Sequence, residues 1–205
     1  IEDQRSVSAL ALLDATGTIY CNGGLRGTAA HVTVPGADVK MLAIIVTAAH
    51  VLVEIANYYG NKGFQFHPMN HGGSWDFEFG VVKYVNAIHT SAFADGTYGG
   101  QPGGFVIEGE RKNIYIAGDT ALTMDMKLIP LRTKLDLAIL PIGSNFTMDV
   151  EDAIFASDFV ECDKVLGYHY DTFGYIEINH EEAKRKFFEK GKDLMLLEIG
   201  ESIEL

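Results

Sequence analysis

The sequence predicts an α+β protein, and three observations support this fold class. Residues 1–52 contain short apolar segments separated by glycine and proline turns, a pattern typical of β-strands. After residue 52, similar segments alternate with two stretches of helical character. The whole chain of 205 residues is 47% hydrophobic and 21% charged, which is a globular composition. We therefore expect strands throughout and helices mainly in the second part.

The first part predicts three strands and one helix. The turns Asn22-Gly23-Gly24 and Pro35-Gly36 delimit strands over 17–21 and 27–34. The continuous apolar run MLAIIVT predicts a buried strand over 41–47. A helix over 51–59, ended by Gly60, is expected from its one apolar face.

The second part predicts six strands and two helices. The helices cover 149–160 and 180–190, and Asn179 is a suitable N-cap for the second of them. The glycine-rich stretch 91–104 predicts a long loop that borders a site. The expected strands are 81–88, 105–108, 113–117, 135–142, 164–168 and 193–199.

The composition changes near residue 52. Residues 1–52 contain four acidic and three basic side chains, so almost all of the net charge of −12 belongs to the rest of the chain. Tyr20 is the only aromatic residue before residue 53. Such a shift predicts a division into 1–52 and 53–205, either as two parts or within one compact domain.

Charge and composition also limit the partners. A chain this acidic should repel phosphate backbones, so we expect no nucleic-acid partner. No apolar run approaches the roughly 18 residues needed to span a membrane, and no signal-like segment is present. Two cysteines, Cys21 and Cys162, suit a reducing compartment and predict a cytoplasmic protein. A small-molecule substrate is then the expected partner, with oligomerisation left open.

Three predicted strands run into a residue that can bind a metal ion. These residues are His89, Asp119 and His169. Strand ends can converge on one edge of a sheet, and two imidazoles with a carboxylate suit zinc, or manganese or iron. The alternative is that both histidines are hydrogen-bonded structural residues and Asp119 forms a turn.

Six segments after about residue 54 carry a resemblance to a known family. They are HPMNHGGSWDFEFG (67–80), NAIHTS (86–91), GGQPGGFVIE (99–108), IYIAGDTALTMDMKL (114–128), LDLAILPIGSNFTM (135–148) and GYHYDTFG (167–174). Through them the chain resembles a subgroup of metal-dependent hydrolases in the metallo-β-lactamase superfamily. The resemblance implies an αββα sandwich and a divalent metal, with zinc the first choice. It implies that His89 is a ligand of the first metal, that Asp119 bridges two metals, and that His169 is the last ligand of the second.

The family's HxHxDH signature, which supplies further ligands to both metals, is absent from this sequence. The nearest stretch, TAAHVLV (47–53), keeps only His50 and lies too close to the segment that follows. The expected sandwich is therefore incomplete at its N-terminus, and the expected activity is impaired.

Residues 1–52 contain RGTAAHV (26–32) and IIVTAAHVL (44–52). Through these two segments they resemble the start of a trypsin-like serine protease instead, and this resemblance implies that His50 is a general base. LDLAIL (135–140) is superficially similar to the aspartate segment of such proteases, but no Gly-Asp-Ser-Gly-Gly nucleophile segment exists. The chain thus looks chimeric.

Three functions remain open from the sequence. The first is a metal-dependent hydrolase that uses His89, Asp119 and His169, with Asp119 also catalytic. The second is an inactive chimera that serves as a structural or binding module. The third is a serine protease fragment based on His50.

Overall fold

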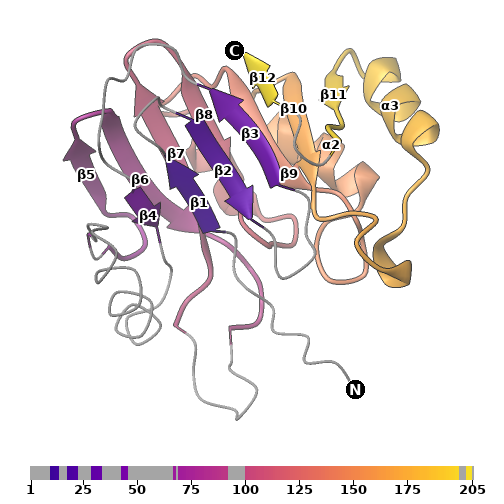
Figure 1. The fold of residues 1–205 in the computed structure, drawn as a ribbon, viewed down its shortest axis with the longest axis horizontal. Coiled ribbons are helices and arrows are strands. Elements are labelled where there is room, and N and C mark those ends of the chain that lie inside the picture. The colour runs from indigo at the N-terminus through magenta and orange to yellow at the C-terminus, as the bar shows by residue number, and fades with distance from the viewer. Residues whose placement is uncertain are drawn as a thin grey trace.

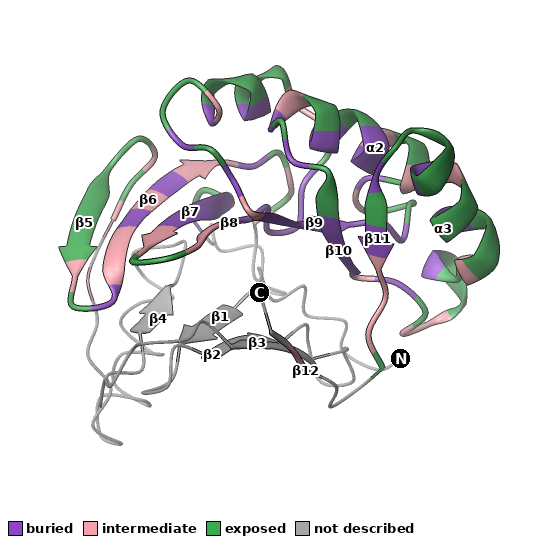
Figure 2. Cartoon of the chain, turned by 90° about the horizontal axis from the view of Figure 1, so that it is seen from above, coloured by how far each residue is buried: buried purple, intermediate pink, exposed green. Residues whose placement is uncertain are grey.

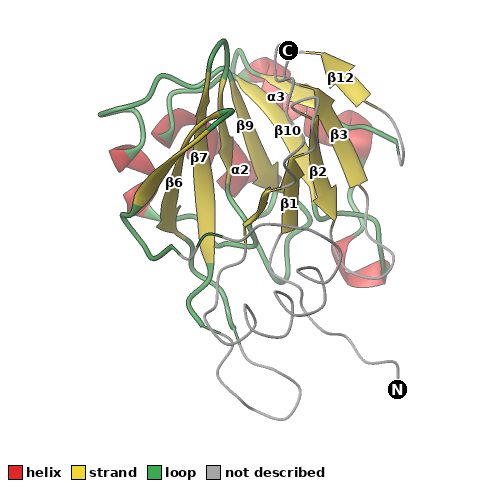
Figure 3. Cartoon of the chain, turned by 60° about the vertical axis from the view of Figure 1, so that its left-hand side comes forward, coloured by secondary structure: helices red, strands yellow, loops and turns green. Residues whose placement is uncertain are grey.

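The computed structural model describes residues 10–13, 18–22, 29–33, 43–45, 67, 69–91, 100–198 and 202–204. In the four ranges before residue 67 it describes the backbone strands only. Figure 1 shows the arrangement of the elements, and Figure 3 shows strands and helices by type.

A seven-stranded mixed sheet forms the centre of the described chain. Its strand order is β11-β10-β9-β8-β7-β6-β5. Strands β5 to β8 form an antiparallel meander, whereas β8, β9, β10 and β11 are parallel neighbours. The strands are β5 (Ser74–Phe77), β6 (Gly80–Asn86), β7 (Gly103–Gly109), β8 (Asn113–Ile116), β9 (Leu137–Pro141), β10 (Lys164–Tyr168) and β11 (Asp193–Met195).

This topology brings several strand ends together. Because β6 and β8 are both antiparallel to β7, they run in the same direction as β9 and β10. The C-terminal ends of these four strands therefore share one edge of the sheet, which we call the carboxyl edge. The chain segments that follow them are the natural place for a site in such a sheet.

Two helices cover one face of this sheet (Figure 2). They are α2 (Val150–Phe159) and α3 (His180–Glu189), and the side chains of Asp149 and Asn179 cap them by accepting hydrogen bonds from backbone N–H groups. Two short 3-10 helices, η1 (Met124–Leu128) and η2 (Gly174–Ile176), complete the described helical segments.

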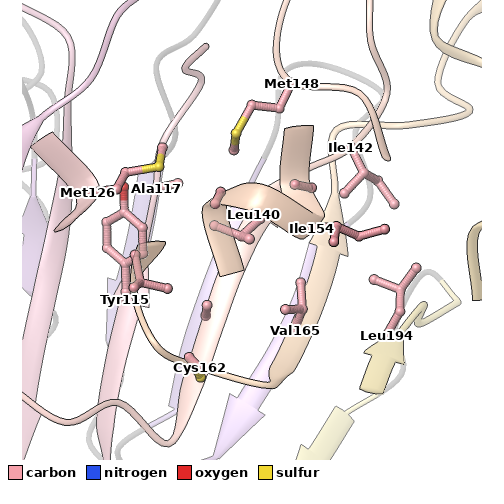
Figure 4. Close-up of a cluster of buried hydrophobic side chains, with 14 of the residues drawn as sticks. Tyr115, Ala117, Met126, Leu140, Ile142, Met148, Ile154, Cys162, Val165 and Leu194 are labelled. Atoms are coloured by element: carbon pink, nitrogen blue, oxygen red, sulfur yellow. The ribbon is translucent and has the colours of Figure 1, made fainter. Parts of the chain in front are cut away.

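Alternation along the strands produces a hydrophobic layer on each face of the sheet. In β9, Ala138 and Leu140 belong to the layer below the helices, whereas Leu137 and Ile139 belong to the layer on the other face. Figure 4 shows part of the helix-side layer, where Tyr115 lies beside Met126. Complete burial raises the pKa of Tyr115, so this phenol stays neutral.

A second sheet contacts the hydrophobic layer on the face of the seven-stranded sheet that the helices do not cover. Ile203 of β12 (Ser202–Glu204) packs against that layer, and β12 pairs in parallel with β3 (Ala29–Thr33). The remaining strands are β2 (Thr18–Asn22), β1 (Leu10–Leu13) and β4 (Ala43–Ile45), giving the order β12-β3-β2-β1-β4. Two facing sheets with helices outside one of them confirm the α+β sandwich.

The predicted elements occur with ends shifted by at most four residues, apart from the helix expected over 51–59, which lies outside the described residues. Sequence patterns missed β1, β5 and β12. Strand β5 is an exposed edge strand, SWDF, and β12 is only three residues long. Neither strand therefore has the apolar alternation that predicts a strand. None of the helices described here has the length and apolarity needed to cross a membrane.

Candidate metal site

The three predicted ligands all lie at the carboxyl edge. His89 follows β6, Asp119 follows β8, and His169 directly follows β10. The parallel directions of these strands bring residues that are 80 positions apart in sequence to one edge of the sheet.

The division of the chain into residues 1–52 and 53–205 stays a prediction.

Asp119 and His169 lie closest to one another. Nε2 of His169 is 3.8 Å from Oδ2 of Asp119, and the aspartate side chain is only 9% exposed. Burial raises the pKa of Asp119, while the two imidazoles of His169 and His89 oppose that rise. A buried carboxylate next to two imidazoles is thus the central electrostatic feature of this edge.

His169 has an unsatisfied nitrogen. Its Nδ1 is buried and makes no hydrogen bond within the described residues, and Nε2 is beyond hydrogen-bonding distance of Asp119. The 3.8 Å separation is close to the roughly 3.4 Å between two ligand atoms on one tetrahedral cation with bonds of about 2.1 Å. The pair therefore fits a shared metal ion better than it fits a direct hydrogen bond.

One ring nitrogen of His89 already has a hydrogen-bond partner. Its Nδ1 lies 2.8 Å from the carbonyl oxygen of Thr90, which can only accept, so Nδ1 carries the proton. The lone pair is then on Nε2, which is the tautomer that a metal ligand needs. Within the described residues, however, no three His, Cys, Asp or Glu side chains are close enough together to hold a metal.

His50 lies outside the described residues, so its predicted role as a base or ligand stays a prediction.

Thr120, which sequence reasoning did not assign to the site, connects the loops that carry the candidate ligands. Its fully buried Oγ1 accepts a hydrogen bond from Ile88 N at 3.0 Å and donates one to Ala121 O at 2.8 Å. Ala121 N in turn donates to Ile88 O at 3.0 Å, and Met148 N donates to Thr120 O at 3.1 Å. These bonds fix the segments next to His89 and Asp119 relative to one another.

A second set of contacts shapes the backbone at His169. This residue has a positive φ of 57°, which is unfavourable for any residue other than glycine. A Cβ at Gly143 would lie 2.0 Å from the carbonyl oxygen of His169, so only glycine fits there. Two residues on, Asp171 accepts from Ile178 N at 2.9 Å and lies 2.5 Å from Nε2 of His180. The turn after β10 is therefore held from both sides.

Other candidate residues have structural partners away from this pair. His67 stacks on Trp75 with ring centroids 4.0 Å apart, and Nε2 of His71 lies 2.8 Å from Pro102 O. Asp136 precedes β9 and bonds the backbone of Asn113 at the opposite edge of the sheet. It therefore cannot join a catalytic group at the carboxyl edge.

Comparison with known proteins agrees with the fold. Residues 22–170 match the family model described as beta-lactamase superfamily domain. A UPF0173 metal-dependent hydrolase of Christiangramia forsetii is 82% identical over 152 residues, covering 74% of this chain and 67% of that protein. A UPF0173 metal-dependent hydrolase of Flavobacterium johnsoniae is 80% identical over 163 residues, covering 80% and 71%.

Solved structures share the architecture. Igni18, a metallo hydrolase from the archaeon Ignicoccus hospitalis, superposes with a TM-score of 0.64 at 23% identity, covering 95% of this chain and 97% of that one. An isothiocyanate hydrolase from Delia radicum gut bacteria gives a TM-score of 0.55 at 20% identity, covering 73% and 63%.

The protease resemblance of residues 1–52 receives no support from these comparisons. The family match begins at residue 22 and so includes both segments on which that resemblance depends. None of the relatives and structures named above is a serine protease.

Proposed function

This chain belongs to the UPF0173 metal-dependent hydrolases of the β-lactamase superfamily, and we propose that Asp119, His169 and His89 hold its divalent metal ion. Zinc is the first choice because it accepts two imidazoles and a carboxylate, and manganese or iron are alternatives. A small molecule is the proposed substrate, and the cytoplasm is the proposed location.

One observation carries this assignment. Nε2 of His169 lies 3.8 Å from Oδ2 of Asp119, whose side chain is 9% exposed, whereas that of His169 is 22% exposed. A buried carboxylate is costly unless a positive charge or hydrogen bonds compensate it. A cation held between Oδ2 of Asp119 and Nε2 of His169 would supply that compensation.

The residues at and around Asp119 and His169 would each help to hold a cation. A bound cation would supply a water molecule of lowered pKa. Asp119 provides negative charge in a place from which most water is excluded, so its attraction to a cation is weakly screened. The Thr90 carbonyl keeps the proton on Nδ1 of His89 and leaves Nε2 free to bind. Without HxHxDH, we propose that a second metal is bound weakly or not at all and that hydrolysis is correspondingly slow.

Metal content tests the assignment. After purification in the presence of zinc, manganese and iron, the wild type should retain close to one equivalent of metal, and Asp119→Asn should fall below about 0.1 equivalent. Asp136→Asn is the matched control, because this aspartate lies at the opposite edge, and it should retain the wild-type content. Wild-type protein with less than about 0.1 equivalent would overturn the proposal.

The missing signature also favours a second candidate, an inactive binding or structural module formed by a join near residue 52. Such a module folds without metal, so zinc should leave its melting temperature unchanged. A large rise on zinc addition would count against it, because a ligand stabilises the state it binds. Intact mass together with resequencing across residues 45–60 tests the join itself.

A further inference from the structure

Three aromatic side chains gather at the carboxyl edge. The ring centroids of Phe146 and Phe173 are 5.8 Å apart, and those of Phe173 and Tyr175 are 6.4 Å apart. Phe146 is 48% exposed and Tyr175 is 76% exposed. We call these three residues the aromatic rim, and they form an accessible apolar surface that crosses two loops.

The loop carrying Phe146 is anchored beside the candidate ligands. At its start, Ile142 N donates to Tyr168 O at 3.0 Å, and Gly143 packs against the His169 carbonyl. At its end, Met148 N donates to Thr120 O, one residue from Asp119. Phe173 and Tyr175 follow His169 by four and six residues. The aromatic rim therefore borders the proposed metal site.

The charges at this edge are of one sign. The described loops 87–91, 117–125, 143–149 and 169–180 contain no lysine or arginine. Their five carboxylates are Asp119, Asp125, Asp149, Asp171 and Glu177. Sites that bind phosphodiesters or carboxylates through protein groups normally present Arg, Lys or several backbone N–H donors. The side chains of these loops would therefore favour a substrate without negative charge, whereas the proposed cation is the one positive charge that an anionic group could meet there.

We propose that the aromatic rim binds an aromatic or similar apolar group of an uncharged substrate, such as a neutral ester. This inference rests on the proposed hydrolase function and specifies its substrate class. Hydrolysis of such an ester bonds the oxygen of water to the carbonyl carbon, breaks the bond to the alkoxy oxygen, and transfers a proton from water to the departing alcohol. Ring stacking on Phe173 and Tyr175 would hold the substrate while its carbonyl reaches the edge between Asp119 and His169.

Binding of two matched probes tests the aromatic rim without turnover. Acetophenone and benzoate carry the same ring, but only benzoate is charged. Saturation-transfer NMR on the purified wild-type protein should show acetophenone binding at least about fivefold more tightly than benzoate. Tyr175→Ala and Phe146→Ala should each weaken acetophenone binding about threefold or more, since each removes one exposed ring. Phe188→Ala, an 80% exposed ring at the far end of α3, is the control and should leave binding unchanged.

Three results would overturn this proposal. They are equal binding of both probes, acetophenone binding that survives both rim variants, and a dimer on size exclusion that the rim variants dissociate while acetophenone fails to bind. The last would make the rim a contact between two copies. The two probes are therefore compared on chelator-treated protein as well as on the protein as purified, because a bound cation can coordinate benzoate. A result against the rim in chelator-treated protein is independent of the metal assignment.

Discussion

At the scale of single residues, the candidate site depends on a hydroxyl that no substrate needs to touch. Thr120 is fully buried, and its Oγ1 serves both Ile88 N and Ala121 O. Its backbone carbonyl receives Met148 N. Thr120 thus acts as a positioning residue that fixes three loops around Asp119.

Thr120→Val should therefore damage stability and metal binding together. The isosteric methyl leaves Ile88 N without its acceptor, which should cost about 1–3 kcal/mol and lower Tm by several degrees. Zinc affinity should fall about tenfold, because loops that support ligands contribute on that scale. Thr120→Ser keeps the hydroxyl and serves as the control, and both quantities can be measured by calorimetry. Unchanged Tm and zinc affinity in the valine variant would show that the hydroxyl positions nothing.

At the scale of elements, a buried lysine connects helices to strands at the edge opposite the site. The Lys192 side chain is 4% exposed, and its Nζ lies 2.8 Å from Asp158 and 3.1 Å from Asp163. Burial disfavours its charge, but the carboxylates of Asp158 and Asp163 outweigh burial, so the pKa of Lys192 is raised. The lysine joins the end of α2, the start of β10 and the turn before β11.

Lys192→Met should lower the free energy of unfolding by about 1 kcal/mol at pH 7, with the exposure of both aspartates limiting the loss. Because the folded pKa is raised, the lysine's contribution is complete below about pH 10.4 and is lost as the pH rises through the folded value. Denaturant unfolding at pH 7 and pH 11 should show the difference between wild type and variant shrinking at pH 11. A constant difference would mean that altered packing of the side chain, and not its charge, accounts for the loss. Lys190→Met, an exposed neighbour, should have little effect at either pH.

The sequence predicted elements where the pattern of apolar residues was strong. The run LDLAIL predicted β9, and Asn179 correctly marked the start of α3. The edge strand β5 could not be predicted, because three of its four residues are exposed and no alternation shows which face is buried. For the proposed site, the strand-end rule predicted that His89, Asp119 and His169 share one edge of the sheet, and they do, while their role as metal ligands stays a prediction. It could not locate Thr120 or the aromatic rim, because their roles depend on contacts between loops that are distant in sequence.

At the scale of the whole molecule, two sheets are joined through one short strand described near the end of the sequence. Ile203 packs on the seven-stranded sheet, while its own strand, β12, pairs with β3. This residue therefore connects the two layers of the sandwich.

Ile203→Asp should weaken both contacts, because a carboxylate in an apolar layer is poorly solvated. We expect a loss of about 2 kcal/mol or more in stability, compared with roughly 0.5–1.5 kcal/mol for the control Ile203→Val. Hydrogen exchange should accelerate at the amides of residues 29–33 in the aspartate variant. Wild-type exchange at those amides in a folded Ile203→Asp protein would contradict this role.

The pairing of β3 with β12 joins segments separated by about 170 residues. On the ribosome, β3 emerges early, but its neighbour is synthesised only after the whole seven-stranded sheet. Throughout that interval one edge of β3 lacks its partner strand and is available to pair with other chains. Completion of the sandwich is thus a late step of biosynthesis, and protein expressed at high temperature should aggregate before this step more than after it.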